Sequence, residues 1–177
     1  LLAPRHPERC ELVEQLLRES ALRYCRHSTA GQSDVSDCDV FLIDTLGELN
    51  AFYGSADIAF VGGSLVPIGG HNLLEPAAHG LPILTGPHNF NSEDVLELLV
   101  AAGAAAVVAD ERELQARVES LLTDPAERQR RGALGREYEP SRKEHCVVVG
   151  DLSVGRGEEL QRECCCQCTD DPAHRAA

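Results

Sequence analysis

Short runs of mainly apolar residues recur along the chain, and each is followed by a turn containing glycine or a polar residue and then by a helical pattern. The clearest runs are residues 40–43, 58–61, 82–85 and 104–109. Strands that are apolar at nearly every position are typical of parallel sheets covered by helices on both faces. The sequence therefore predicts an α/β protein with a doubly wound, Rossmann-like parallel sheet.

Helical periodicity and capping residues predict the helices between these runs. The expected helices cover residues 7–22, 45–55, 72–78, 91–102, 111–122 and 124–136. The first has an apolar stripe of Leu12, Val13, Leu16 and Leu17. Residues 1–3 and 22–25 are expected to be further short strands.

Two capping residues are expected to start helices in the middle of the chain. Thr45 has Glu48 three residues later, which is the spacing of a capping box. Asn72 is expected to cap the helix that ends near residue 78, before Gly80.

Composition limits the class of protein. The chain has 177 residues, the size of about one domain. Its net charge of −13 disfavours general binding to nucleic acid, and the 4% aromatic content with no Trp disfavours a base-stacking surface. No apolar run reaches the roughly 20 residues of a membrane-spanning helix.

The character of the chain changes near residue 139. We expect residues 1–139 to form the α/β domain and residues 140–177 an irregular, Cys-rich tail. The tail contains most of the eight cysteines, including Cys164, Cys165, Cys166 and Cys168. It is interpreted either as a metal-binding or disulfide segment or as non-native sequence. The second is favoured, because three consecutive cysteines cannot easily all reach one tetrahedral ion.

Ligands of doubly wound sheets bind at the carboxyl ends of the strands, so the loops that follow the strands are the candidate site. Arg5 lies where the first strand meets a helix and suits an anion, or else a surface salt-bridge cluster. Gly47 allows a ligand to approach the backbone. Glu48 beside it is more simply a capping carboxylate.

The loop over residues 62–75 is rich in glycine and ends at a helix. Glu75 is suited to accept hydrogen bonds from a vicinal diol such as a ribose, or else to complete a capping box. His71 is interpreted either as a contact to a phosphate or sugar or as a solvated loop residue. His71, His79 and His88 lack metal-ligand spacing, and Ser64 lacks the context of a serine nucleophile, so neither metal nor serine catalysis is expected.

Several motifs occurring in one order resemble those of a known enzyme family. They are RHPER at residues 5–9, DTLGEL at 44–49, FVGGSLVP at 60–67, GGHNLLEP at 69–76 and GLPILTGPH at 80–88. In this order they resemble the C-terminal half of the 3-deoxy-D-manno-octulosonic acid (Kdo) transferases. The similarity fades near Gly135.

The resemblance implies a glycosyltransferase of the GT-B class, built from two Rossmann-like domains. The C-terminal domain of such an enzyme binds the donor CMP-Kdo, and Kdo passes to a lipid A precursor during lipopolysaccharide assembly at the cytoplasmic face of the bacterial inner membrane. No metal or other cofactor is implied. By motif position, the residues expected to contact CMP are Pro4, Arg5, Leu46, Gly47, Glu48, Asn72, Leu73, Leu74 and Glu75.

The expected roles within this set follow the chemistry of CMP. Arg5 and the backbone amides at the helix starts are assigned to the phosphate, the turn at residues 46–48 to cytosine and Glu75 to the ribose. The N-terminal domain of the family, with its acceptor site, membrane anchor and catalytic base, is expected to be missing. The chain alone is therefore expected to contain no catalytic residue and to be inactive. A non-catalytic nucleotide-binding module and a GT-B domain for a UDP-sugar remain the alternatives.

Overall fold

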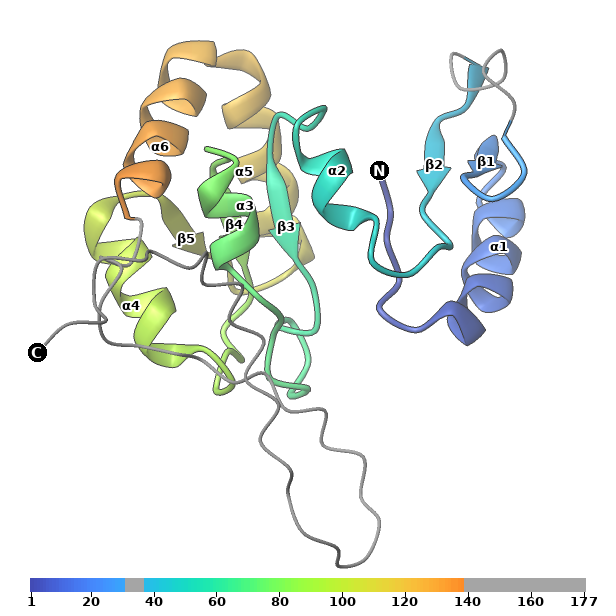
Figure 1. Ribbon diagram of the computed structural model, residues 1–177, viewed down its shortest axis with the longest axis horizontal. Helices are drawn as coiled ribbons and strands as arrows, with labels where there is room; N and C mark the ends of the chain where they lie inside the picture. Colours follow the sequence, from blue (N-terminus) through green and yellow to red (C-terminus); the bar gives the residue numbers. More distant parts are fainter. Residues whose placement is uncertain (31–36, 139–177) are drawn as a thin grey trace, which may run out of the picture. The chain divides into compact units, whose positions relative to one another are not determined.

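The structure, a computed structural model, describes residues 1–30 and 37–138 (Figure 1). The chain divides into two units, Leu1–Glu139 and Pro140–Ala177. The expected Cys-rich tail lies outside the described residues.

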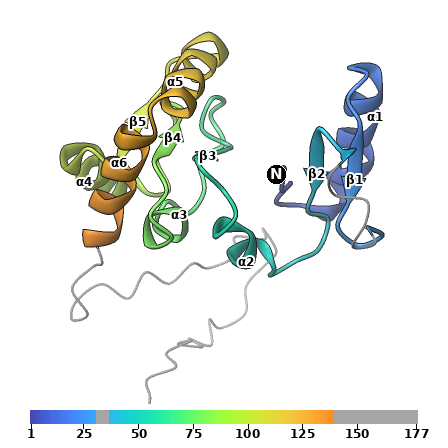
Figure 2. The ribbon, with the colours of Figure 1, turned by 90° about the horizontal axis from the view of Figure 1, so that it is seen from above.

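The first sheet pairs two parallel strands, β1 (Tyr24–Arg26) and β2 (Val40–Leu42). Leu2 adds a single parallel bridge to Leu42. A short 3-10 turn, η1 (Pro7–Arg9), leads into helix α1 (Cys10–Glu19), which lies beside β1 in Figures 1 and 2. Residues 1–3 thus extend this sheet as the sequence predicts, although by only one bridge.

Helix α1 buries Leu17 of the predicted stripe, but not Leu12 or Leu16. Cys10, Glu14 and Leu17 are its buried residues, whereas Leu12 and Leu16 are 58% and 54% exposed. Positions 10, 14 and 17 follow the helical repeat of three to four residues and lie on one face. The prediction that Leu12 and Leu16 face the core is therefore wrong.

The second sheet has three parallel strands in the order β3 (Ala59–Val61), β4 (Ile83–Thr85) and β5 (Ala105–Val107). Ala59 lies opposite Ile83, and Ile83 lies opposite Ala105. Neighbouring residues of a strand point to opposite faces, so Ile83 and Leu84 enter two different core clusters. Both are 1% exposed, which explains why β4 is apolar on both faces.

Helices cover both faces of this second sheet, as the ribbon views show (Figures 1 and 2). One cluster packs strand residues against α3 (Leu74–Ala78), α4 (Glu93–Ala102) and α6 (Pro125–Glu137). The other packs them against α5 (Glu111–Thr123), which contributes Leu121. The predicted class, a parallel α/β fold with helices on two sides, is confirmed.

The parallel strands are divided between two sheets. The sequence predicts a single doubly wound sheet, but β2 and β3 share no ladder in the described part of the chain. The segment at residues 1–3 pairs with β2 alone, through its one bridge at Leu2.

The capping prediction at Thr45 is wrong. Helix α2 (Leu49–Tyr53) begins after Glu48, which makes no side-chain capping hydrogen bond. Gly47 has a φ of +80°, so the chain turns sharply between Thr45 and the helix. The Thr45 hydroxyl is buried without a hydrogen-bond partner, and the Glu48 carboxylate instead lies 3.3 Å from Nε2 of His27.

Within residues 1–30 and 37–138, no helix combines the length and the apolar character needed to cross a membrane.

Candidate functional site

The loops after β3 and β4 leave the same edge of the second sheet and are fastened to each other. The backbone N–H of Gly86 donates to the hydroxyl of Ser64 at 2.8 Å, and that of His88 donates to the Ser64 carbonyl at 2.9 Å. Further along, Gly70 N–H donates to the Gly63 carbonyl at 3.0 Å. These bonds make the loops a single platform at the carboxyl edge of the sheet.

A buried polar network lies under this platform. Ser64, Thr85 and Asn89 are 0%, 0% and 4% exposed. The Thr85 hydroxyl donates to Oδ1 of Asn89 at 2.9 Å, and Nδ2 of Asn89 donates to the Gly86 carbonyl at 2.5 Å. Buried polar groups with satisfied hydrogen bonds fix one arrangement of the chain. Sequence reasoning missed this role, although polar residues at the ends of apolar strands were its signal.

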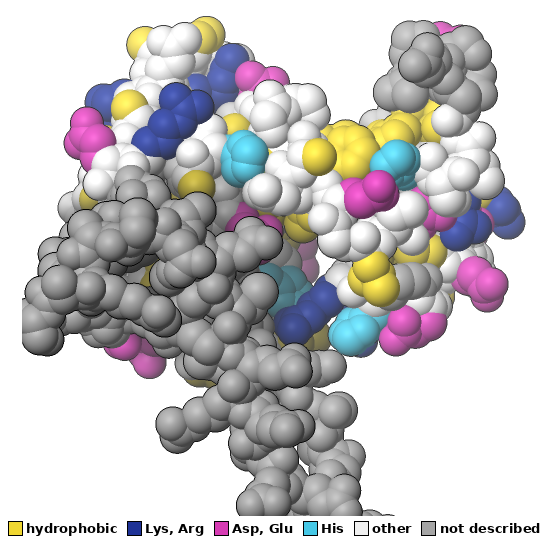
Figure 3. All heavy atoms as spheres, in the orientation of Figure 1, with side chains coloured by type: hydrophobic (Ala, Val, Ile, Leu, Met, Phe, Trp, Pro, Cys, Tyr) yellow, Lys and Arg dark blue, Asp and Glu magenta, His cyan; other side chains and the backbone are white. Residues whose placement is uncertain are grey.

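Arg5 meets this platform at His71. An Nη1 of Arg5 lies 3.1 Å from Nδ1 of His71, which brings the loop after the N-terminal segment to the loop after β3. Burial is the largest cause that lowers the pKa of His71, followed by the positive charges of Arg5 and His6. Figure 3 shows basic and histidine side chains gathered on this face. The structure thus joins two of the loops that the sequence selects.

Asn72 and Glu75 form a hydrogen-bonded pair at the start of α3. Nδ2 of Asn72 donates to Oε1 of Glu75 at 2.9 Å, and Oδ1 of Asn72 accepts the backbone N–H of Leu74 at 3.0 Å. The N-cap is Leu73 rather than Asn72, so the predicted cap is displaced by one residue. The second oxygen of the half-buried Glu75 carboxylate remains to accept from a ligand.

The predicted CMP-contact residues differ in what they can offer a ligand. The side chain of Leu73 is 0% exposed and packs in the core, so only its backbone can reach a ligand. Leu46 is 73% exposed, and a Cβ added at Gly47 would meet no atom within 4 Å. The turn at residues 46–48 is therefore open, as backbone recognition of a ligand requires.

Helix α2 connects that turn to α3. Oδ1 of Asn50 lies 2.9 Å from Nε2 of His79, which caps the end of α3, and the Tyr53 and His79 rings lie 5.5 Å apart. Burial raises the pKa of Tyr53, and the negative charge of Glu75 raises it further. The turn at residues 46–48 leads into α2, and α2 contacts the end of α3, the helix that contains Glu75.

Asp44, in the loop after β2, is held by hydrogen bonds from Arg26 and Ser28. It accepts hydrogen bonds from Arg26 Nε at 2.8 Å, from Ser28 N–H at 2.9 Å and from the Ser28 hydroxyl at 2.5 Å. Burial by itself raises the pKa of Asp44, but the bonds from Ser28 and Arg26 outweigh it and lower the pKa from 3.8 to about 2.

Because the pKa of Asp44 is lower in the folded chain than in the unfolded one, its carboxylate contributes stability above pH 3.8 that is lost as pH falls through about 2. In an Asp44→Asn variant we expect lower stability near neutral pH and a flatter decline between pH 4 and pH 2. Urea midpoints measured across this range test the expectation. Asp57→Asn, at a 66% exposed side chain, is the control. Parallel curves for wild type and Asp44→Asn would contradict it.

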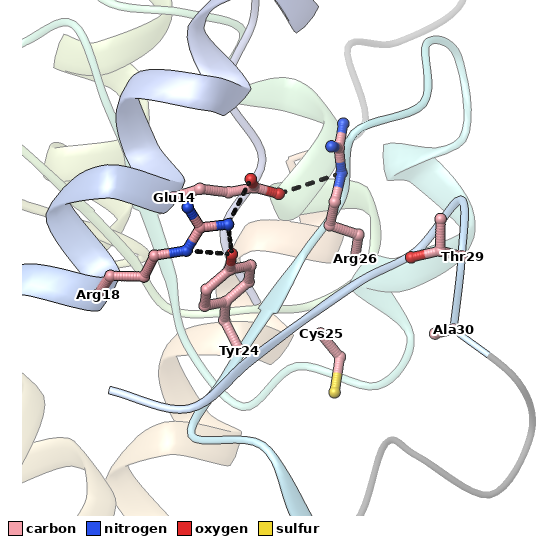
Figure 4. A pocket seen from close by; sticks show the side chains of 7 residues that line it. All are labelled: Glu14, Arg18, Tyr24, Cys25, Arg26, Thr29 and Ala30. Carbon is pink, nitrogen blue, oxygen red and sulfur yellow. Dashed lines mark hydrogen bonds and ion pairs between the residues drawn. The ribbon is translucent and has the colours of Figure 1, made fainter. Parts of the chain in front are cut away.

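A cavity of about 440 Å³ lies away from the predicted site, between α1 and β1 (Figure 4). Its lining residues are Glu14, Arg18, Tyr24, Cys25, Arg26, Thr29 and Ala30. Arg18 donates to the Tyr24 hydroxyl at 2.7 Å, and Arg26 Nε lies 3.3 Å from Glu14. The cations that line this cavity already have partners, and none of the expected CMP contacts lines it.

Among the described residues, no three His, Cys, Asp or Glu side chains form a metal-binding group.

Known proteins resemble this chain over most of its length. No family model matches it. The Kdo transferase of Haemophilus influenzae is 44% identical over 138 residues, which are 77% of this chain and 32% of the relative. That of Bordetella pertussis is 43% identical over 129 residues, 73% of this chain and 30% of the relative. The chain spans about a third of the length of these curated relatives.

A solved structure matches the fold as well as the sequence. It is the crystal structure of the C-terminal CMP-Kdo binding domain of WaaA from Acinetobacter baumannii, with a TM-score of 0.71 and 32% identity. The match covers 76% of this chain and 69% of that one. The expected parallel α/β fold is therefore the fold of this domain. The chain belongs to the 3-deoxy-D-manno-octulosonic acid transferase family and corresponds to its C-terminal domain.

Proposed function

We propose that this chain is the part of a Kdo transferase that binds the sugar donor CMP-Kdo. The observation that carries the proposal is the contact of Arg5 with His71, next to the Asn72–Glu75 pair, at the carboxyl edge of a parallel sheet. A cation and a carboxylate held on neighbouring loops suit a ligand that carries both a phosphate and a vicinal diol. The matched domain of WaaA is named for binding CMP-Kdo, which supports the same ligand.

Each predicted contact has a chemical role in this proposal. Arg5 binds the phosphate, because a guanidinium can donate two parallel hydrogen bonds to phosphate oxygens. The open backbone at residues 46–48 binds the edge of cytosine. Glu75 accepts hydrogen bonds from the ribose hydroxyls through the oxygen that Asn72 leaves free. Pro4, Leu73 and Leu74 complete the site, with Leu73 acting through its backbone.

In the intact enzyme, a hydroxyl of the lipid A precursor attacks the anomeric carbon of Kdo, and the bond to the CMP phosphate breaks. A carboxylate base outside this chain takes the proton of that hydroxyl, and Arg5 stabilises the departing phosphate. The reaction takes place at the cytoplasmic face of the bacterial inner membrane. The chain by itself binds the donor and transfers nothing.

Calorimetric titration of the chain with CMP and with UDP tests the donor. We expect CMP to bind more tightly than UDP, and a preference for UDP would assign a different sugar nucleotide.

Arg5→Ala and Glu75→Ala should each weaken CMP binding by roughly tenfold to a hundredfold, the effect expected when a hydrogen bond that involves a charge is lost. Arg112→Ala and Glu111→Ala, at exposed positions of α5, are matched controls. Unchanged CMP affinity in both variants would show that Arg5 and Glu75 do not bind CMP.

Complementation separates a transferase domain from a nucleotide-binding module. The remaining part of the Haemophilus influenzae relative would be supplied as a separate chain, together with CMP-Kdo and the lipid acceptor. Restored Kdo transfer supports the enzyme. CMP binding without restored transfer, although both chains are folded and associate, would favour the module.

A further inference from the structure

We infer that His71 is a positioning residue of the donor site, which holds the Arg5 guanidinium in the orientation that binds the donor phosphate. This inference rests on the proposed function. It starts from the contact of Nδ1 of His71 with Arg5 Nη1 at 3.1 Å, between residues 66 positions apart in the chain.

The chemistry of the two side chains fixes the direction of this hydrogen bond. A guanidinium has only donors, so Nδ1 of His71 must be the acceptor and the ring proton must lie on Nε2. A neutral ring is required for this, and burial together with the charges of Arg5 and His6 lowers the pKa of His71. His71 is thus set to accept from Arg5 rather than to act as a second cation on the phosphate.

The platform formed by the loops after β3 and β4 holds the His71 ring in place. A Cβ added at Gly63 would lie 3.2 Å from Nε2 of His71, so the ring packs closely over that glycine. The N–H of Gly70, the residue before His71, donates a hydrogen bond to the Gly63 carbonyl. The ring is half-buried, whereas Arg5 is exposed. An exposed arginine has many accessible rotamers. The packed ring of His71 therefore limits the orientations of Arg5.

Orienting Arg5 leaves most of its N–H groups available. One N–H is occupied by His71, and the others of its five can bind phosphate oxygens. A guanidinium held before the ligand arrives loses less conformational entropy on binding. Loss of the His71 acceptor should consequently weaken binding only when Arg5 is present.

A double-mutant cycle tests this dependence. CMP affinity would be measured by calorimetry for the wild-type chain, Arg5→Ala, His71→Phe and the double variant. His71→Phe keeps an aromatic ring but removes the acceptor, and we expect it to weaken binding roughly tenfold. When Arg5 is already alanine, His71→Phe should change the CMP affinity by less than about twofold. His71→Asn, which keeps an acceptor near Nδ1, should recover most of the affinity, and Arg112→Ala, at an exposed position of α5, should have no effect.

Each result has a distinct meaning. If His71→Phe weakens binding equally with and without Arg5, or not at all, the positioning role is overturned. A wild-type chain that fails to bind CMP would instead refute the proposed function. The ring tautomer of His71, read from its nitrogen-15 resonances, needs no substitution of His71: we expect the Nε2–H form in the wild-type chain and a mixture in Arg5→Ala. A wild-type ring protonated on Nδ1 would also overturn the inference.

Discussion

Replacing Gly132 by alanine should strongly destabilise the domain, by roughly 3 kcal/mol or more. Gly132 lies in the middle of α6, where that helix packs directly on the backbone of Gly80. A Cβ at Gly132 would overlap the Gly80 carbonyl oxygen. A backbone carbonyl cannot rotate away as a side chain does, so α6 would have to move off its neighbour. The loss should exceed the gain of about 1 kcal/mol that alanine brings to a helix interior.

Gly135→Ala is the matched control for this prediction. Gly135 is buried in the same helix, but a Cβ there would lie 3.5 Å from Cα of Ala77 and 3.6 Å from Cβ of Ala104, which are ordinary contacts. We expect this variant to be as stable as the wild type or to gain up to about 1 kcal/mol. Urea unfolding followed by circular dichroism compares the two. Equal stability of Gly132→Ala and Gly135→Ala would show that α6 does not pack as described.

The fold class followed from the sequence because burial on both faces of a strand leaves a simple local signal. The runs at 58–61 and 82–85 became β3 and β4, whose residues Ile83 and Leu84 face opposite core clusters. Asp124 before Pro125 likewise predicted the start of α6, and its carboxylate accepts the N–H of Glu127 at 3.0 Å. Strand identity and helix caps of this kind depend on residues close together in the chain.

Errors arose where a position depends on contacts that the local pattern does not show. The Thr45 capping box has the right spacing, yet the positive φ of Gly47 shifts the start of α2 beyond it. The apolar stripe of α1 was placed on Leu12, Val13, Leu16 and Leu17, but the structure buries Leu17 together with Cys10 and Glu14. An ion pair of Glu14 with Arg26, 3.3 Å long, makes a carboxylate acceptable on the buried face.

The candidate site shows the same division. That the loops after the strands carry it follows from the general geometry of parallel sheets, and Arg5 and Glu75 could be proposed from their motifs. The partner of Arg5 could not, whereas the capping box proposed for Asn72 and Glu75 names the right pair of residues but the wrong donor atom. Arg5 meets His71 across 66 residues, and Glu75 bonds the side chain of Asn72 rather than a backbone N–H. Ser64 joins the loops after β3 and β4 through the bond from Gly86 N–H, which a single sequence does not reveal. Asn89 bonds Thr85 and Gly86 within its own loop.

That platform leads to the second large expected effect, at Gly86. This residue follows β4 and passes against the backbone of the loop after β3. A Cβ at Gly86 would overlap the Ser64 carbonyl group and lie 2.5 Å from the Leu65 nitrogen. Gly86→Ala would therefore separate the two loops and break the buried bond from Gly86 N–H to the Ser64 hydroxyl. We expect a loss of roughly 3 kcal/mol or more, from overpacking together with buried polar groups left unpaired.

Gly62 supplies the comparison, because it occupies the equivalent position after β3 and a Cβ there would meet no atom within 4 Å. Gly62→Ala should change stability by no more than about 0.5 kcal/mol. Urea unfolding measures both variants, and hydrogen exchange at the amides of Gly70 and Gly86 shows whether the platform has opened. In Gly86→Ala those two amides should exchange much faster even in conditions where the sheet stays folded. If Gly86→Ala keeps wild-type stability and both amides stay protected, the loops are not braced through Ser64, and the fixed support for His71 disappears with them.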